Sequence, residues 1–254
     1  MATRLLLTMV LVLTSILSFA DSNTRSFSLE DVTKLHLDGD ITVNFSQTDR
    51  AHAEITLVDG AWEDVEIDQN GDRFKVSGET GFWNFFGDSD VELDITLSLP
   101  EVTRLELVGE VEFYADSLDS EKLDIELVGA CFAVFKNTLA TQSLAVEMTG
   151  ATKLEAETLT AHTAKLELTG ASTLKVLSAG SIPTLDVRLT GASNVYAKPL
   201  QTQSVNTEAT GASNLELQVS DHLKARLSGA SNVYYGGTPK LDIKTSGASS
   251  VQTY

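Results

Sequence analysis

Hydrophobic and polar residues alternate with a period of two through most of this chain, and the alternation is organised around a recurring glycine. Eight segments align on that glycine without gaps, and consecutive glycines lie 18 to 21 residues apart. Alternation with a period of two predicts β-strands, and a repeat of about twenty residues predicts a solenoid with one coil per repeat. We therefore predict an all-β fold, a single-stranded parallel β-helix. The eight glycines are Gly109, Gly129, Gly150, Gly170, Gly191, Gly211, Gly229 and Gly247.

Each glycine can be taken as position zero of its coil, so that equivalent residues form columns along the solenoid. Positions −4, −2, +4 and +6 are mostly apolar, and we expect them to point into the core. The residue at +1 is alanine from Gly129 onward. We expect the glycine to supply a permissive backbone at a tight corner, with the alanine packed inside it. Position +3 carries Asn194, Asn214 and Asn232, and like residues stacked on consecutive strands predict a hydrogen-bonded ladder.

The N-terminal third follows the same frame with an interruption. Residues 35–45 match a coil around Gly39 and are expected to form the end coil. The period breaks over residues 46–100, which we predict to be a sheet that begins and caps the β-helix before regular coils over 101–254. The strands expected in this sheet are 53–58, 65–67, 73–76 and 91–99, with a hairpin turn over 69–72.

The first twenty residues have the pattern of a secretory signal peptide. A short basic start at residues 1–4 precedes an apolar run over 5–17, and Ser18 and Ala20 place small residues before a cleavage site. The apolar run is shorter than a membrane span requires. We therefore predict cleavage, leaving 21–254 as a single exported domain that does not span a membrane.

Charge and cysteine content exclude several classes of function. The chain carries 18 Lys and Arg against 36 Asp and Glu, a formal net charge of −18. Such an acidic chain repels phosphate backbones, which argues against a nucleic-acid partner. The single cysteine, Cys131, excludes an internal disulfide and a cysteine-based zinc site. It occupies position +2, where other coils carry small residues, so we expect it to fill a corner rather than to react.

The chain also resembles a known family. The resemblance rests on the glycine-centred repeat, on the early segment Leu37-Asp-Gly-Asp-Ile-Thr-Val43 and on Ile95-Thr-Leu-Ser-Leu-Pro-Glu-Val-Thr-Arg-Leu-Glu-Leu107. These features resemble the exported bacterial domain of unknown function called the putative auto-transporter adhesin head GIN domain, over about residues 27–250. The resemblance implies a right-handed parallel β-helix in the cell envelope of a Gram-negative bacterium, in the periplasm or on the surface. It implies no functional residues.

Position −3 provides one candidate site. Four consecutive coils carry glutamate there, including Glu126, Glu147 and Glu167. One interpretation is a strip that binds calcium or a cationic ligand. The other is a solvated face. The small repulsion between neighbouring glutamates favours this second interpretation, because two exposed charges about 5 Å apart repel by less than about 1 kcal/mol in water. No other cofactor is indicated.

Aromatic residues provide a second candidate. Phe82, Trp83, Phe85 and Phe86 lie in a loop bounded by glycines. They are expected either to contact a sugar or a partner, or to plug the open end of the core. A further set of tyrosines is expected to face outward, namely Tyr114, Tyr196, Tyr234 and Tyr235.

These features point to two functions. The first is a non-enzymatic envelope or cell-surface module that binds an extracellular glycan or an envelope protein. The alternative is a glycan-active enzyme, a polysaccharide lyase or hydrolase, on the same scaffold. The lack of converging acid and base residues favours the first. We also expect weak homodimerisation through the C-terminal coil, 241–254, whose Leu241, Ile243 and Val251 belong to inward columns.

Overall fold

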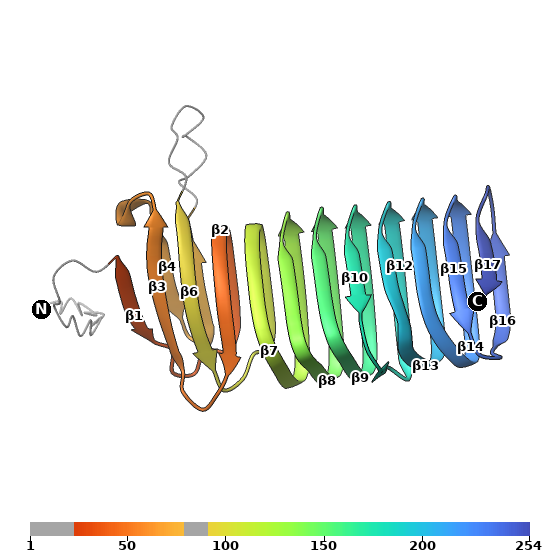
Figure 1. Cartoon of the computed structure of the whole chain (residues 1–254), viewed down its shortest axis with the longest axis horizontal. Helices are drawn as coiled ribbons and strands as arrows, with labels where there is room; N and C mark the ends of the chain where they lie inside the picture. Colours follow the sequence, from red (N-terminus) through yellow and green to blue (C-terminus); the bar gives the residue numbers. More distant parts are fainter. Residues whose placement is uncertain (1–22, 79–90) are drawn as a thin grey trace, which may run out of the picture.

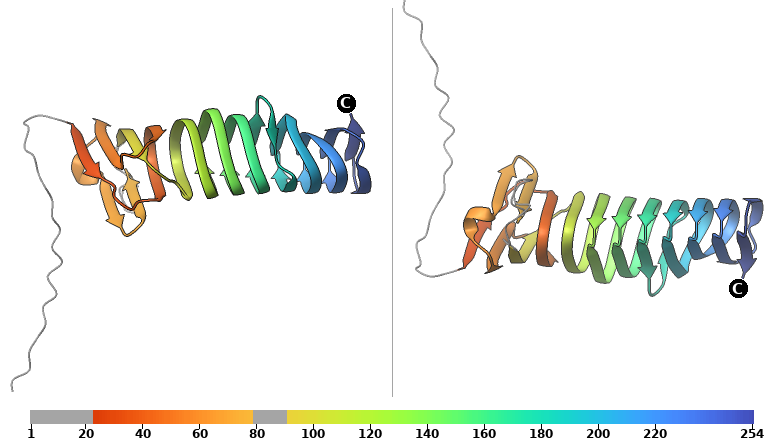
Figure 2. Two further views of the ribbon diagram at one scale, coloured as in Figure 1. Left: turned by 90° about the horizontal axis from the view of Figure 1, so that it is seen from below. Right: turned by 90° about the horizontal axis from the view of Figure 1, so that it is seen from above.

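The structure is a computed structural model that describes residues 23–78 and 91–254. Its strands wind into a solenoid with one coil stacked on the next along a single axis, as Figure 1 and the two views of Figure 2 show. From residue 104 onward the strands pair in parallel, so the predicted parallel β-helix is confirmed. These strands are β7 (Arg104–Gly129), β8 (Phe132–Gly150), β9 (Lys153–Gly170), β10 (Thr173–Val176), β11 (Gly180–Ser181), β12 (Thr184–Gly191), β13 (Asn194–Gly211), β14 (Asn214–Gly229), β15 (Asn232–Gly236), β16 (Lys240–Thr245) and β17 (Ser250–Thr253).

The register places equivalent residues of successive coils directly beside one another. Gly129 pairs with Gly150 and Gly150 with Gly170, so each column of the sequence is a column in space. In every coil but the last, side chains at the four predicted inward positions are buried, as Leu166 and Leu168 show at 1% exposure. One hydrophobic core therefore runs along the axis from the N-terminal strands to the last coil.

The corner glycine is required for two physical reasons. At Gly191 the backbone φ is +89°, a region that residues with a side chain rarely adopt. A Cβ atom at this position would also lie 2.6 Å from the carbonyl oxygen of Gly170 in the preceding coil. That oxygen accepts a hydrogen bond from the backbone N–H of Ala192 at 2.8 Å, so it has no room to move away.

The prediction that the corner alanines pack inside is wrong. Ala192 is exposed, and Ser193 at position +2 is fully buried. The period of two continues through the corner, so even positions face inward and odd positions face water. The Ser193 hydroxyl donates to the carbonyl oxygen of Thr190 at 2.9 Å, which satisfies a polar group inside the core. Cys131 takes the same place, with its sulfur 3.3 Å from the carbonyl oxygen of Val128.

The predicted asparagine ladder is present on the side that follows the corner. The Asn214 side-chain amide donates to Asn194 at 2.8 Å, and that of Asn232 donates to Asn214 at 3.2 Å. Ser250 extends the series, since its hydroxyl lies 2.8 Å from the Asn232 side-chain oxygen. These contacts give the asparagines a structural role.

The N-terminal region contains one coil more than the sequence pattern indicated. Strand β2 (Lys34–Gln47) carries Gly39, and it is not the end coil. It lies between β7 on one side and a discontinuous coil made of β5 (Arg73–Ser77) and β6 (Glu92–Leu99) on the other (Figure 1). Gly78 stands beside Gly39 in this coil, and its N–H donates to the carbonyl oxygen of Asp38 at 2.9 Å. The long segment between Gly78 and β6 hid this coil from the periodic pattern.

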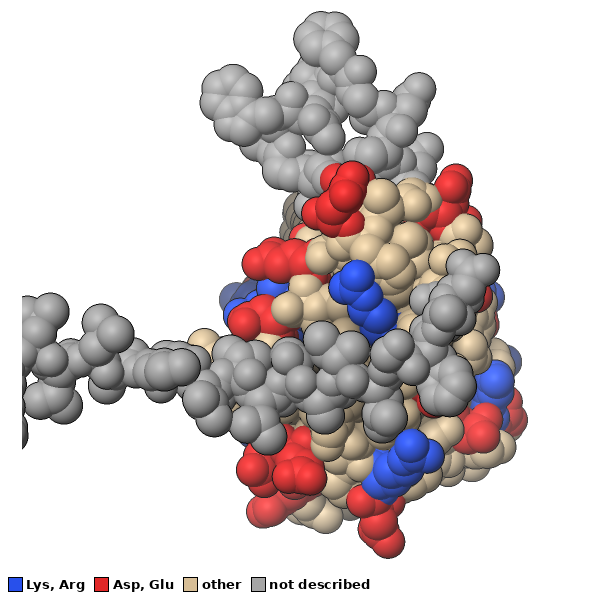
Figure 3. Space-filling model, turned by 90° about the vertical axis from the view of Figure 1, so that its left-hand side faces the viewer, with Lys and Arg blue, Asp and Glu red and all other residues tan. Residues whose placement is uncertain are grey.

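Antiparallel strands lie at the N-terminal end of the solenoid. Strand β3 (His52–Asp59) pairs antiparallel with β6, and β1 (Thr24–Ser28) pairs antiparallel with β3. Strand β4 (Glu66–Asn70) forms a hairpin with β5, with Gly71 in the predicted turn at φ +59°. A single 3₁₀ turn, Trp62–Asp64, lies between β3 and β4. Figure 3 views this end, where acidic and basic side chains lie around the rim.

The C-terminal end has no comparable covering in the described chain. Strands β16 and β17 pair with β14 and β15 in parallel on one side. Leu241 continues the column of the buried Leu223 but is 49% exposed, and Ile243 and Val251 are only partly buried. Across residues 23–78 and 91–254 no helix is long and apolar enough to cross a membrane.

Candidate functional site

One outer side of the solenoid, which we call the charged face, is formed by positions −5 and −3 of each coil. Glu126, Glu147 and Glu167 lie here on β7, β8 and β9 in direct register. Their side chains face outward because they occupy odd positions between buried residues of the core. The structure therefore brings the three predicted glutamates together as one strip.

Basic side chains neutralise two members of this strip. Arg104 contacts Glu126 at 2.6 Å, and Glu167 contacts Arg188 at 2.6 Å and Lys165 at 3.0 Å. Ion pairs that remain in contact with water contribute little to stability, with a typical value of about 0–1 kcal/mol. Their main effect is to hold the carboxylates in a fixed, charge-compensated pattern on the surface.

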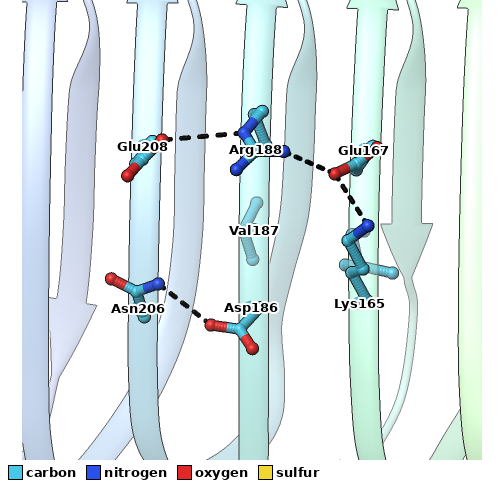
Figure 4. A pocket seen from close by; sticks show the side chains of 8 residues that line it. Lys165, Glu167, Asp186, Val187, Arg188, Asn206 and Glu208 are labelled. Atoms are coloured by element: carbon cyan, nitrogen blue, oxygen red, sulfur yellow. Dashed lines mark hydrogen bonds and ion pairs between the residues drawn. The ribbon is translucent and has the colours of Figure 1, made fainter.

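A shallow, open pocket of about 250 Å³ lies on the charged face. Figure 4 shows Arg188 between two glutamates, with Glu167 on β9 and Glu208 on β13, the latter at 3.6 Å. Below this row, the Asn206 side-chain amide donates to the Asp186 carboxylate at 3.0 Å. The pocket presents donors and acceptors in a regular array, and it is open to solvent rather than closed around its contents.

The calcium hypothesis for Glu126, Glu147 and Glu167 stays a prediction. In the part of the chain that the structure describes, no group of three His, Cys, Asp or Glu residues is placed to hold a metal ion. A divalent cation on the strip would have to displace the Arg104 guanidinium from Glu126 and the Arg188 guanidinium from Glu167.

Ion pairs lower the pKa of two carboxyl groups, Glu66 and Asp242. The Lys75 ammonium beside Glu66 holds the pKa of that carboxyl below its usual range, and the Arg226 guanidinium does the same to the pKa of Asp242. A general acid in glycoside hydrolysis needs a pKa shifted upward. Burial raises the pKa of the Cys131 thiol, which makes the reactive thiolate harder to form.

A second outer side, formed by positions +3 and +5, carries an aromatic cluster of which the sequence pattern singled out Tyr114 but not Phe132. The rings of Tyr114 and Phe132 meet edge to face, with centroids 6.1 Å apart. The Lys153 ammonium lies 4.8 Å from the centroid of Phe132, and the Lys136 ammonium lies 5.9 Å from that of Tyr114. The sequence did contain a signal for this cluster. Phe132 stands at the outward position +3, in the column that carries Asn194 and its equivalents in later coils.

The other aromatic predictions have mixed outcomes. Tyr114, Tyr196 and Tyr234 face outward, with Tyr196 37% exposed. The prediction that Tyr235 faces outward is wrong, because Tyr235 occupies the even position +6 and is buried beside Leu217. The loop residues Phe82, Trp83, Phe85 and Phe86 lie outside the described residues.

The fold and its faces define a class of protein. It is a parallel β-helix whose stacked corners support outer faces of regularly spaced polar and aromatic side chains. Within that class, the chain belongs to the family described as "putative auto-transporter adhesin, head GIN domain", whose model matches residues 31–239. No curated protein matches the chain.

Solved structures share this architecture over nearly their whole length. A putative adhesin from Parabacteroides merdae ATCC 43184 has a TM-score of 0.80 and 22% identity, over 91% of this chain and 95% of that chain. A putative adhesin from Parabacteroides distasonis ATCC 8503 has a TM-score of 0.81 and 18% identity, over 91% and 96%. A putative lipid binding protein from the same strain has a TM-score of 0.82 and 15% identity, over 92% and 97%. At these identities the likeness shows the fold alone.

Proposed function

We propose that this protein is a non-enzymatic, exported surface module that binds an extended glycan or protein ligand along its outer faces. The observation that carries the proposal is the open pocket on the charged face, in which each charged side chain labelled in Figure 4 already has a partner. Such a surface binds through many shallow contacts rather than by surrounding a small molecule. The family of adhesin heads to which the chain belongs supports the same function.

Export is part of this proposal. The predicted signal peptide, residues 1–20, lies outside the described residues, and its cleavage would leave 21–254 in the periplasm or on the cell surface. The alternative, a glycan-active enzyme, needs an acid and a base on opposite sides of a bound sugar. The ion-paired carboxylates of the charged face are poorly suited to that role.

The test combines binding and cleavage. Residues 21–254 are applied to immobilised polysaccharides and extracellular proteins, namely mannan, laminarin, alginate, mucin, collagen and fibronectin. We expect retention on at least one of these supports, with no release of reducing ends or unsaturated sugars from the polysaccharides. Catalytic release of sugar products would establish the enzyme alternative, and a lack of retention on every support would contradict the binding function.

A further inference from the structure

We propose that the aromatic cluster on the second outer side is a binding site for an uncharged polysaccharide. We define the aromatic–lysine patch as Tyr114, Phe132, Lys136, Lys153 and Lys175. This inference rests on the proposed binding function and names both a site and a ligand class for it.

The patch is built from four neighbouring coils in strict register. Phe132 pairs with Glu112 on one side and with Lys153 on the other. In the +5 column, Tyr114 pairs with Val134, which in turn pairs with Glu155. Tyr114, Phe132, Lys153 and Lys175 stand at positions +3 and +5, so their side chains rise from the outside of the sheet and do not belong to the core. Lys136 follows at +7, where the register between strands shifts.

The same side of the solenoid has a different composition farther along the axis. From Asn194 onward, the +3 column is occupied by the asparagine ladder, whose side chains bond to one another. No such ladder passes through Phe132, although its backbone has the same register. Phe132 and Tyr114 are half-buried, so their paired rings leave some apolar surface in contact with water, and the structural framework does not require it. A bound ligand would account for it.

The charges around the patch favour an uncharged ligand. Lys153 and Lys175 both contact Glu155, at 2.8 Å and 3.6 Å, and Lys136 lies 4.0 Å from Asp116. The positive and negative groups balance locally, whereas the whole chain carries −18. An acidic polymer lying along the solenoid would be repelled by that net charge, and a neutral polymer would not.

The geometry suits a chain of sugars. The C–H face of a pyranose ring stacks on an aromatic ring, and its hydroxyls bond to nearby amino and carboxylate groups. The Lys153 ammonium lies over the Phe132 ring, so a stacked sugar would move it aside and could accept a hydrogen bond from it. The Tyr114 hydroxyl already donates to Glu112 at 2.7 Å, which leaves the carboxylate fixed beside the rings. Successive coils are spaced by about 4.8 Å, close to the length of one sugar unit in an extended polysaccharide. A polysaccharide laid along the axis would therefore meet Tyr114, Phe132 and Lys153 with successive sugars.

The experiment measures the binding of residues 21–254 to soluble polysaccharides by affinity gel electrophoresis. Mannan, laminarin and dextran are the neutral probes, and alginate and polygalacturonate are the acidic ones. The test variants are Phe132→Thr and Tyr114→Thr, since threonine already occupies the Phe132 column at Thr173 and suits a strand. The matched control is Tyr234→Thr, an outward tyrosine in the same +5 column that lies three coils beyond Lys175. Phe132→Tyr, which keeps the ring, is the conservative variant.

The expected result is retardation by at least one neutral probe, with a dissociation constant that rises at least tenfold in Phe132→Thr and Tyr114→Thr. Tyr234→Thr and Phe132→Tyr should bind within threefold of the parent, and melting curves of all variants establish that they are folded. Should Phe132→Thr fail to fold, Tyr114→Thr measured against the same control decides the question.

The remaining outcomes overturn the inference, and they separate it from the proposed function. Neutral polysaccharide binding that persists unchanged in both threonine variants places the glycan elsewhere on the protein. Binding only to the acidic probes, or only to an immobilised protein, excludes an uncharged glycan. In each of these cases the proposed function stands. If the protein binds none of the polysaccharides and none of the immobilised proteins, both this inference and the proposed function are wrong.

Discussion

The corner of the solenoid and its outer sides differ in how their residues change from coil to coil. At the corner, glycine, alanine and a small residue recur in almost the same form, and the glycine and the small residue each have a contact that explains them. On the outer sides, the residue in one column changes from glutamate to arginine, or from phenylalanine to asparagine. This difference indicates that the repeated columns hold the fold together, while the outer columns are free to vary, and it is there that we propose the binding site.

The largest effect is expected from the corner glycine. Gly191→Ala should lower the free energy of unfolding by about 3 kcal/mol or more, because a side chain is strained at positive φ and would also press on the Gly170 carbonyl oxygen. Thermal or urea unfolding followed by circular dichroism measures the change. The neighbouring Ala192→Leu is the control, expected to change stability by no more than about 0.5 kcal/mol, since Ala192 is exposed. Equal losses in both variants would mean that the whole corner is buried.

A smaller effect is expected at the next position. Ser193→Ala should cost about 1 kcal/mol, because the carbonyl oxygen of Thr190 loses a buried donor. Ser193→Cys should cost less than Ser193→Ala, since Cys131 makes the equivalent contact in its own coil. Urea unfolding of the three proteins gives the ranking. An alanine variant as stable as the parent would show that the hydroxyl column contributes nothing.

The charged face should tolerate substitution far better than the corner. Replacing Glu126, Glu147 and Glu167 together by glutamine should change the free energy of unfolding by less than about 1 kcal/mol, since the ion pairs lost are exposed to water. The same variant tests the calcium hypothesis. We expect no rise in melting temperature with calcium in either protein, because arginine already occupies two of the carboxylates. A rise in the parent that the triple variant lacks would establish calcium binding.

The smallest effect is expected at the C-terminal coil. In a protein comprising residues 21–254, Ile243 and Val251 lie in inward columns but are only partly covered, so we expect weak self-association through this coil. Ile243→Thr with Val251→Thr should reduce it. Light scattering over a concentration series measures the association. A monomer at all concentrations, in both the parent and the double variant, would show that the coil caps itself.

The corner also shows why the sequence predicts some details and misses others. The alternation at Leu166 and Leu168 was sufficient to assign the core, because one side of each strand must exclude water. The same alternation places Ala192 outside and Ser193 inside. Residue type alone suggested the reverse, because alanine is apolar and serine is polar. The structure resolves the conflict through the Thr190 carbonyl oxygen, which gives the buried hydroxyl a partner.

The sequence by itself determined the solenoid, its period and the orientation of most side chains, because the glycine spacing and the alternation are local properties of the chain. Only the tertiary structure decided that β2 lies between β7 and the coil of β5 and β6, since that pairing joins segments that are distant in the sequence and out of order along the axis. It also decided which outward residues meet. Tyr114 and Phe132 are 18 positions apart in the chain, and they are neighbours only because one coil returns the backbone to the same side of the sheet.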